Sequence, residues 1–153
     1  MTIRMKTLYV EIAIIALTLL VCKFLNNQKL GRWNILVKNT RGTSLNQQTW
    51  FDFCSLTLVA FGMLFQKIAL FLPWTKEARH LALVSGLGVF KVLENHAFFL
   101  HVWKDPSFKG EALINTFADM LCGVAGYEFA KYTPYIPTVF LSGALIYLIP
   151  CQS

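Results

Sequence analysis

Hydrophobic residues in this chain form long blocks that polar stretches separate. Five blocks are predicted as helices, and they cover residues 7–25, 53–72, 81–103, 111–131 and 135–149. A helix needs roughly 20 predominantly apolar residues to cross the hydrocarbon core of a bilayer. The first four blocks reach about this length, and the last is shorter. The pattern therefore predicts an all-α, polytopic membrane helix bundle with five transmembrane segments, or four if the last is re-entrant.

The third block, Leu81–Trp103, differs from the others because it carries several charged and polar residues. At about 100° per residue, Lys91, Glu94, Asn95 and His101 fall within roughly 120° of one another. A charge that faces lipid near the bilayer centre costs at least about 2.5–3.5 kcal/mol. This face is therefore expected to meet protein or water, and the other helices are expected to cover it.

The fourth block carries a stripe of small and polar residues roughly 80° wide at helical geometry. Its members are Asn115, Asp119, Gly123, Gly126 and Ala130. Small residues let helix backbones approach closely in lipid, so Gly123, Gly126 and Ala130 are predicted to pack against another helix. Gly62, on a similar small face of the second block, has the same predicted role. Asp119 is then expected to face the polar side of the third helix, near Lys91, Glu94 or His101.

The overall composition fits a single membrane domain over residues 1–153. Hydrophobic residues make up 56% of the chain, and the formal net charge is +6. Most basic residues lie in loops or at block ends, where they can contact phospholipid headgroups. No separate soluble basic module is present, so binding to nucleic acid is not predicted.

The first block has features of a signal peptide, because Arg4 and Lys6 precede a long apolar stretch. Val21 is too large for the small residue that processing before Cys22 would require, and no A-x-A site follows. A retained first transmembrane helix is the better interpretation. Glu11 lies in its first turns and is expected to reach the membrane interface. Lys67, near the end of the second block, is expected to extend its amine to water.

Neither a metal site nor a catalytic site is predicted, and no cofactor is implied. Cys22, Cys54, Cys122 and Cys151 are far apart and are interpreted as structural residues. Paired metal ligands on one helix need a spacing of three or four residues. His96 and His101 are five apart, and no H-E-x-x-H motif occurs. A nucleophile motif such as G-x-S-x-G is also missing.

The charged residues Lys91, Glu94 and Asp119 allow two interpretations. Lys91 and Glu94 are three apart on a helix and can form an ion pair that fixes how the helices pack. Alternatively, Glu94, Asp119 and His101 line a polar cavity or ion path, since intramembrane acids and histidines are typical of such paths. The leading hypothesis is a non-enzymatic scaffold or channel-like component that is oligomeric or joined to other membrane subunits. Ion or small-solute transport and an enzyme acting on lipid-linked substrates are the alternatives.

Two features between Gly86 and Ala130 resemble a known family. Glu94 lies on one helix, and the later segment Asp119–Gly126, DMLCGVAG, has glycines at one-turn intervals, with Ala130 one turn further on. This region resembles the VanZ-like group of small membrane proteins associated with glycopeptide (teicoplanin) resistance. Gly123 stands where those chains tend to have Asn, and no Gln follows Glu94 by three. The resemblance implies a multi-pass protein of the plasma (inner) membrane with a cell-envelope function, and it transfers no catalytic residue.

Overall fold

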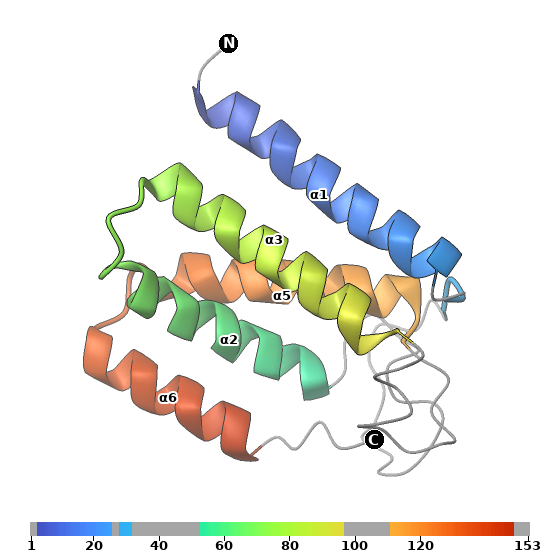
Figure 1. The fold of residues 1–153 in the computed structure, drawn as a ribbon. Helices are drawn as coiled ribbons and strands as arrows, with labels where there is room; N and C mark the ends of the chain where they lie inside the picture. Colours follow the sequence, from blue (N-terminus) through green and yellow to red (C-terminus); the bar gives the residue numbers. More distant parts are fainter. Residues whose placement is uncertain (1–2, 26–27, 32–52, 97–110, 149–153) are drawn as a thin grey trace.

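The computed structural model describes residues 3–25, 28–31, 53–96 and 111–148. These residues form helices and no strand, so the all-α prediction is confirmed (Figure 1). The helices are α1 (Ile3–Leu25), α2 (Phe53–Ala69), α3 (Lys76–Glu94), α5 (Leu113–Ala130) and α6 (Tyr135–Leu148).

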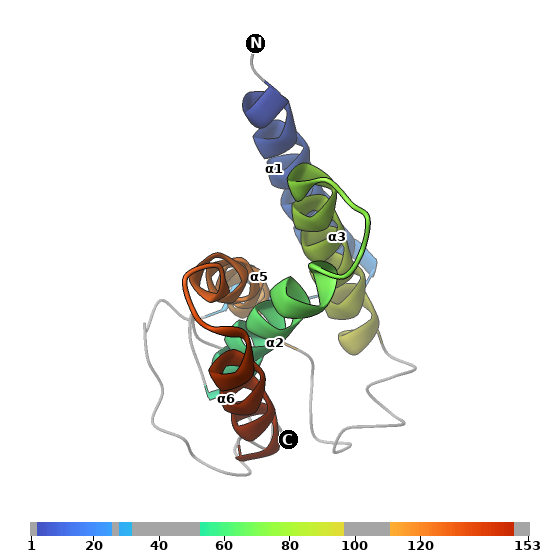
Figure 2. The ribbon, with the colours of Figure 1, turned by 90° about the vertical axis from the view of Figure 1, so that its left-hand side faces the viewer.

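The helices pack around a central pair, α2 and α5, which share the most extensive contact. On one side α3 packs against α5, and α1 lies mainly on α3; on the other side α6 packs on α2. Helices α1 and α6 are therefore at opposite edges of the molecule, as both views show (Figures 1 and 2).

The contacts between side chains fix the directions of the helices. Ser55 near the start of α2 contacts Asp119 in the first half of α5, and Lys67 near the end of α2 contacts Ala130 at the end of α5. Helices α2 and α5 therefore run in the same sense. Lys91 near the end of α3 contacts Glu111, just before α5. Helix α3 is consequently antiparallel to α5.

Glycines permit the close approach of α2 and α5. A Cβ atom at Gly62 would overlap the backbone carbonyl of Gly123, and a Cβ at Gly126 would overlap that of Val59. A Cβ at Gly123 would instead meet the side chain of Leu87 on α3. Ala130 is also fully buried. The helix contact expected from the small-residue stripe thus lies between α2 and α5 of one chain, with α3 on its flank.

An apolar core fills the space between α2, α3 and α5. On α3 it is built from residues three or four apart, which share one face of a helix. Its buried members are Leu58, Leu83, Val84, Leu87, Met120 and Tyr127. Polar side chains lie at both ends of this core, around Lys91 at one end and around His80 at the other.

The third helix does not have the predicted bounds. It begins at Lys76 rather than Leu81, because the Thr75 hydroxyl accepts a hydrogen bond from the Ala78 N–H (3.1 Å) and caps the helix. It ends at Glu94, where Asn95 is the C-cap. The prediction of one continuous helix over residues 81–103 is therefore wrong. His101 lies outside the described residues.

Among the described helices, one is both long and apolar enough to cross a membrane. It is the Met5–Phe24 part of α1, close to the N-terminus, where a signal sequence has the same properties. Shorter apolar helical stretches occur at Ser55–Ala69 and Tyr135–Ile146. Of the five predicted spans, only α1 meets the length and hydropathy criteria among the described residues.

Two charged side chains do not lie as the sequence suggests. Lys67 does not extend to water but is buried, and its Nζ donates to the carbonyls of Ala130 and Thr133, each at 2.6 Å. It thereby adds hydrogen bonds to carbonyl groups at the end of α5 and just beyond it. Glu11 does not project outward either; it contacts His80 of α3.

Candidate functional site

The most heavily charged part of the interior is centred on Lys91. Lys91 follows Val84, Leu87 and Gly88 on the buried face of α3, and its side chain is 1% exposed. Its Nζ lies 3.0 Å from both carboxylate oxygens of Glu111, 3.0 Å from Glu94 and 2.6 Å from Asp119. One ammonium group therefore contacts three carboxyl groups. We call Lys91, Glu94, Glu111 and Asp119 the Lys91 cluster.

The three carboxyl groups come from different positions and differ in burial. Glu94 is one turn after Lys91 on α3, and its side chain is 16% exposed. Glu111 immediately precedes α5, Asp119 is two turns further along, and both side chains are 0% exposed. Ser55 of α2 donates to the second oxygen of Asp119 at 2.6 Å. The cluster thus connects α2, α3 and the start of α5.

Asn95 links the end of α3 to the start of α5. Its side-chain amide donates to the Lys91 carbonyl (2.9 Å), and its Oδ1 accepts from the Glu111 backbone N–H (2.8 Å). Helix α3 ends at this point, with Asn95 as its C-cap. Asn95 therefore positions Glu111 against Lys91 and fixes the geometry of the cluster.

Residues 28–31 cover the start of α5. The carbonyls of Lys29 and Leu30 accept from the N–H groups of Leu113 (2.9 Å) and Ile114 (3.2 Å). The N-cap residue of α5, Ala112, has no side-chain cap, so these carbonyls bind donors that the helix itself leaves unpaired. Gly31 has φ 99°, which only glycine adopts without strain.

A second polar layer surrounds Glu111. The Thr116 hydroxyl lies 3.3 Å from Glu111 Oε2 and 3.5 Å from Gln28 Oε1. Both Thr116 and Gln28 are buried. Residues after α1 therefore contribute to the environment of the cluster, although they are far from it in sequence.

The charges in the cluster do not balance if every group is ionised. One ammonium and three carboxylates give a formal charge of −2 in a region where three of the four side chains are at most 1% exposed. Removing an unbalanced charge from water costs several kcal/mol. Glu94 and Glu111 make further polar or electrostatic contacts beyond these four side chains.

Four of the five residues predicted for a charge cluster lie together in the structure: Lys91, Glu94, Asn95 and Asp119. His101, the fifth, is outside the described residues. Asp119 contacts the polar side of α3, in the geometry expected from its stripe. Asn95 takes part as a helix cap and not as a residue on a continuous helical face.

Glu111 was not identified from the sequence, although it is one of the closest partners of Lys91. It lies four residues before Asn115 and eight before Asp119, so the predicted helix over residues 111–131 would place it on the same small and polar stripe, one turn earlier. That spacing was the available signal. Ser55 and Gln28 carried no comparable one, because their contacts depend on how distant segments pack.

Within the described residues, no group of three His, Cys, Asp or Glu side chains is arranged to hold a metal ion. Comparisons with family models, curated proteins and solved structures give no match to this chain. The chemistry of the Lys91 cluster therefore rests on the geometry of this chain alone.

Proposed function

We propose that this chain is a small multi-pass membrane protein of the cell envelope, and that the Lys91 cluster serves as the proton-binding element of a channel-like or transport component. The observation that carries the proposal is the distribution of polarity: several charged groups are fully buried beside the apolar core, and many large apolar side chains lie on the outside. The proposed role does not include catalysis.

The interior is unusually polar. The largest of the fully buried side chains is Lys91, and the same group contains Glu111, Asn115 and Asp119. In water-soluble proteins, charged residues are almost never fully buried unless they are paired, and the interior is mainly apolar. Charged residues that face the inside of a bundle are instead what membrane proteins use for ion and proton pathways.

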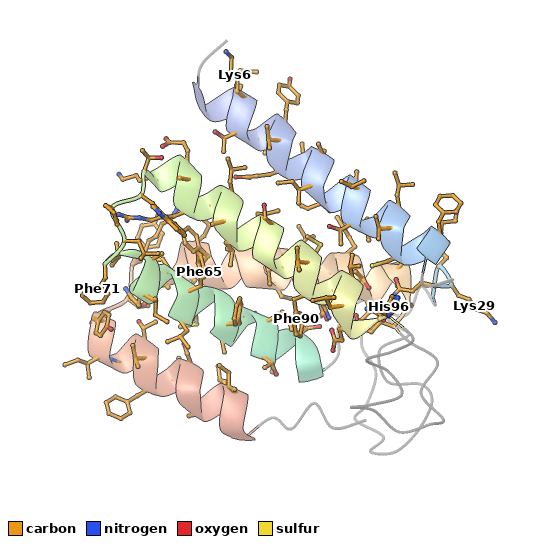
Figure 3. The ribbon with its side chains drawn as sticks, viewed as in Figure 1. Lys6, Lys29, Phe65, Phe71, Phe90 and His96 are labelled. Atoms are coloured by element: carbon orange, nitrogen blue, oxygen red, sulfur yellow. The ribbon has the colours of Figure 1, made fainter. Side chains whose placement is uncertain are left out.

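The exterior is correspondingly apolar. Large hydrophobic side chains project from all five helices, and Phe24, Phe71 and Phe140 are between 73% and 75% exposed. Figure 3 shows Phe71 directed away from the bundle beyond the end of α2, and Phe90 on the outer face of α3. Water-soluble monomers seldom expose apolar patches larger than a few hundred Å². Lipid would cover this surface without such a penalty.

The directions of the helices support several membrane crossings. Helices α1 and α3 run in one sense, because Glu11 meets His80 and Thr18 lies beside Gly88 further along both helices. Helices α2 and α5 run in the opposite sense, so the sense alternates along the chain, as successive crossings require. Helices α2, α3, α5 and α6 have 14 to 19 residues, about 21–28 Å. Local thinning of the bilayer accommodates such lengths.

The resemblance of Gly86–Ala130 to VanZ-like proteins belongs to this proposal. The acidic residues on which it rests, Glu94 and Asp119, both contact Lys91. We also propose assembly with a second copy or with other membrane subunits, because the exposed apolar faces can pack against protein as well as against lipid.

A structural scaffold is the second candidate, and one observation favours it. The contacts of Lys91 with Glu111 and Asp119, and of Asp119 with Ser55, join three helices within one chain. Such a polar connection can fix how helices pack without carrying ions. In that case the charges would matter for folding only.

Proton flux into liposomes separates the two candidates. Purified protein is reconstituted with a pH-sensitive dye inside, and an electrical potential drives protons across the bilayer. The wild type is expected to conduct, whereas Asp119→Asn and Glu111→Gln, which retain similar shapes, are expected to lose most of the flux while keeping their helical content. Glu77→Gln is the control, because Glu77 lies in the first turn of α3, at the end of the helix opposite the cluster.

Flux equal to that of empty liposomes in the wild type would contradict proton transport. Conduction that persists in both cluster variants would contradict the role of the cluster. Loss of folding in these variants, together with a non-conducting wild type, is what the scaffold candidate predicts.

A further inference from the structure

A second polar contact, at the opposite end of α3 from Lys91, joins three helices through one histidine. His80 Nδ1 lies 2.5 Å from a carboxylate oxygen of Glu11 on α1, and its Nε2 lies 3.1 Å from a carboxylate oxygen of Glu128 on α5. The ring also contacts the edge of Tyr127, with centroids 5.2 Å apart. The side chains of His80 and Glu11 are mostly buried.

The number of protons at this contact follows from the chemistry of imidazole. A neutral histidine has one N–H donor and one acceptor nitrogen, whereas the imidazolium ion has two donors. Each ring nitrogen of His80 faces a carboxylate oxygen, and ionised carboxylates only accept hydrogen bonds. Both contacts are therefore satisfied together when the site holds an additional proton, most simply as the imidazolium. Loss of that proton leaves a lone pair facing a carboxylate.

Helix α1 depends on this contact more than the other helices do. The apolar span of α1 is only 11% buried, and it packs mainly on α3. Beyond Glu11, an open apolar groove of about 300 Å³ runs beside the α1–α3 contact, lined by residues such as Leu17, Ser85 and Val89. Apart from the close approach of Thr18 to Gly88, this part of α1 is therefore open on one side.

The two glutamates do not depend on His80 equally. Glu128 also pairs with Lys131, at 2.5 Å, and its side chain is 46% exposed. Glu11 is 14% exposed, and His80 is its ion-pair partner among the described residues. Loss of the proton from His80 therefore affects the connection to α1 most strongly.

We propose that His80 is a proton-dependent clasp, which holds α1 against α3 and α5 when protonated and loosens α1 when it loses its proton. Histidine is the side chain that ordinarily changes charge between pH 5 and 8. Because the closed arrangement binds one more proton than the loosened one, falling pH favours it and rising pH opens it. This inference does not require the Lys91 cluster to conduct.

Other charged groups near this end of the bundle set the local field. These groups carry both signs. Besides Glu11 of α1 and Glu128 of α5, which contact His80 directly, they are Lys67 from α2, Lys76, Glu77 and Arg79 from α3, and Tyr127 and Lys131 from α5.

The test measures the distance between α1 and α5 at two pH values. Spin labels are placed at Tyr9 and Phe129, both exposed, in the full chain with its native cysteines replaced and reconstituted in lipid nanodiscs. Pulsed dipolar spectroscopy at about pH 5.5 and about pH 8 gives the distance distribution. The wild type is expected to show one narrow distance at low pH. At high pH, the ratio of longer to shorter distances is expected to rise about tenfold.

Two variants and two controls make the test specific. His80→Gln and Glu11→Gln are expected to abolish the pH response, whereas His96→Gln is expected to keep it. A label pair at Leu56 and Phe129, across α2 and α5, is expected to be unchanged by pH and reports whether a variant still folds. If His80→Gln fails that check, Glu11→Gln decides. A wild-type distance that does not change with pH, or a response that persists in Glu11→Gln, would overturn the proposal.

Discussion

At the scale of single residues, the molecule depends on buried charges that find their partners within the chain. Lys91 contacts carboxyl groups on both sides, and Asp119 is held from a third helix by Ser55. A buried ion pair gains little stability over an apolar pair, but removing one partner leaves an uncompensated charge. Each member of such a pair is therefore costly to change alone.

We predict that Lys91 and Asp119 are strongly coupled in stability. Lys91→Met and Asp119→Ala should each lower the free energy of unfolding by about 3–5 kcal/mol, and the double variant should lose less than the sum. Lys91 and Glu94 should be coupled more weakly, because water reaches the partly exposed Glu94 side chain. Denaturation in mixed detergent micelles gives the values for both double-mutant cycles.

The exposed pair Glu128 and Lys131 is the control, since such pairs contribute at most about 1 kcal/mol. Simple additivity for Lys91 and Asp119 would mean that each side chain reaches water separately. In that case, the side chains of the Lys91 cluster would not form one unit that excludes water.

At the scale of helices, the sequence predicted more than it did for side-chain partners. The small stripe on α5 was readable because its spacing repeats with the helix turn, and α2 carries Gly62 to match it. The bounds of α3 were not readable in the same way. Asn95 is the C-cap of that helix and also accepts a hydrogen bond from Glu111, which is distant in sequence, and local hydropathy around residues 95–103 gives no sign of either.

The residues of the candidate site were also only partly predictable from the sequence. Lys91, Glu94 and Asp119 were found because charges in apolar blocks are rare and need partners. Glu111 lies at the predicted beginning of a helix, where the helix dipole ordinarily favours an acid, so its position gives no sign that it is buried. The burial of Lys67 is not predictable for a related reason: a lysine near a helix end usually extends to water, and only the packing of α2 on α5 brings it to the Ala130 carbonyl.

We predict that the glycines at the α2–α5 contact differ in their tolerance of alanine. Gly126→Ala and Gly62→Ala should destabilise the protein by about 1–3 kcal/mol or more, because the added methyl group meets backbone carbonyls that cannot move independently. Gly123→Ala should cost less, because it meets the flexible side chain of Leu87. Thermal unfolding of detergent-solubilised protein measures the order.

Gly143 on α6 provides the matched control. No atom lies within 4 Å of a Cβ placed there. Gly143→Ala should be neutral or stabilising by up to about 1 kcal/mol, since alanine favours the helix. If Gly126→Ala and Gly143→Ala behaved alike, the close approach of α2 and α5 would be disproved.

At the scale of the whole molecule, the distribution of polarity decides the interpretation. Among the described helices, α1 alone meets the length and hydropathy requirements for a membrane span. Yet the other helices also bury polar groups and expose phenylalanine, leucine and isoleucine. Helices that cover a polar interior in lipid do not need to be uniformly apolar, because their inner faces meet protein and not the bilayer. The proposed topology therefore depends on what surrounds the outer faces of α2, α3, α5 and α6.

Collisional accessibility of spin labels in lipid bilayers tests that topology most directly. Single labels are placed on outward-facing apolar positions of the five helices, at Leu17, Phe61, Val89, Phe129 and Phe140. Oxygen concentrates in the bilayer core, whereas a charged nickel chelate stays in water. A multi-pass protein with a polar interior is predicted to show greater accessibility to oxygen than to the chelate at all five positions. Lipid contact at Leu17 alone, with the chelate dominating at the other four positions, would contradict it and leave a single-span protein.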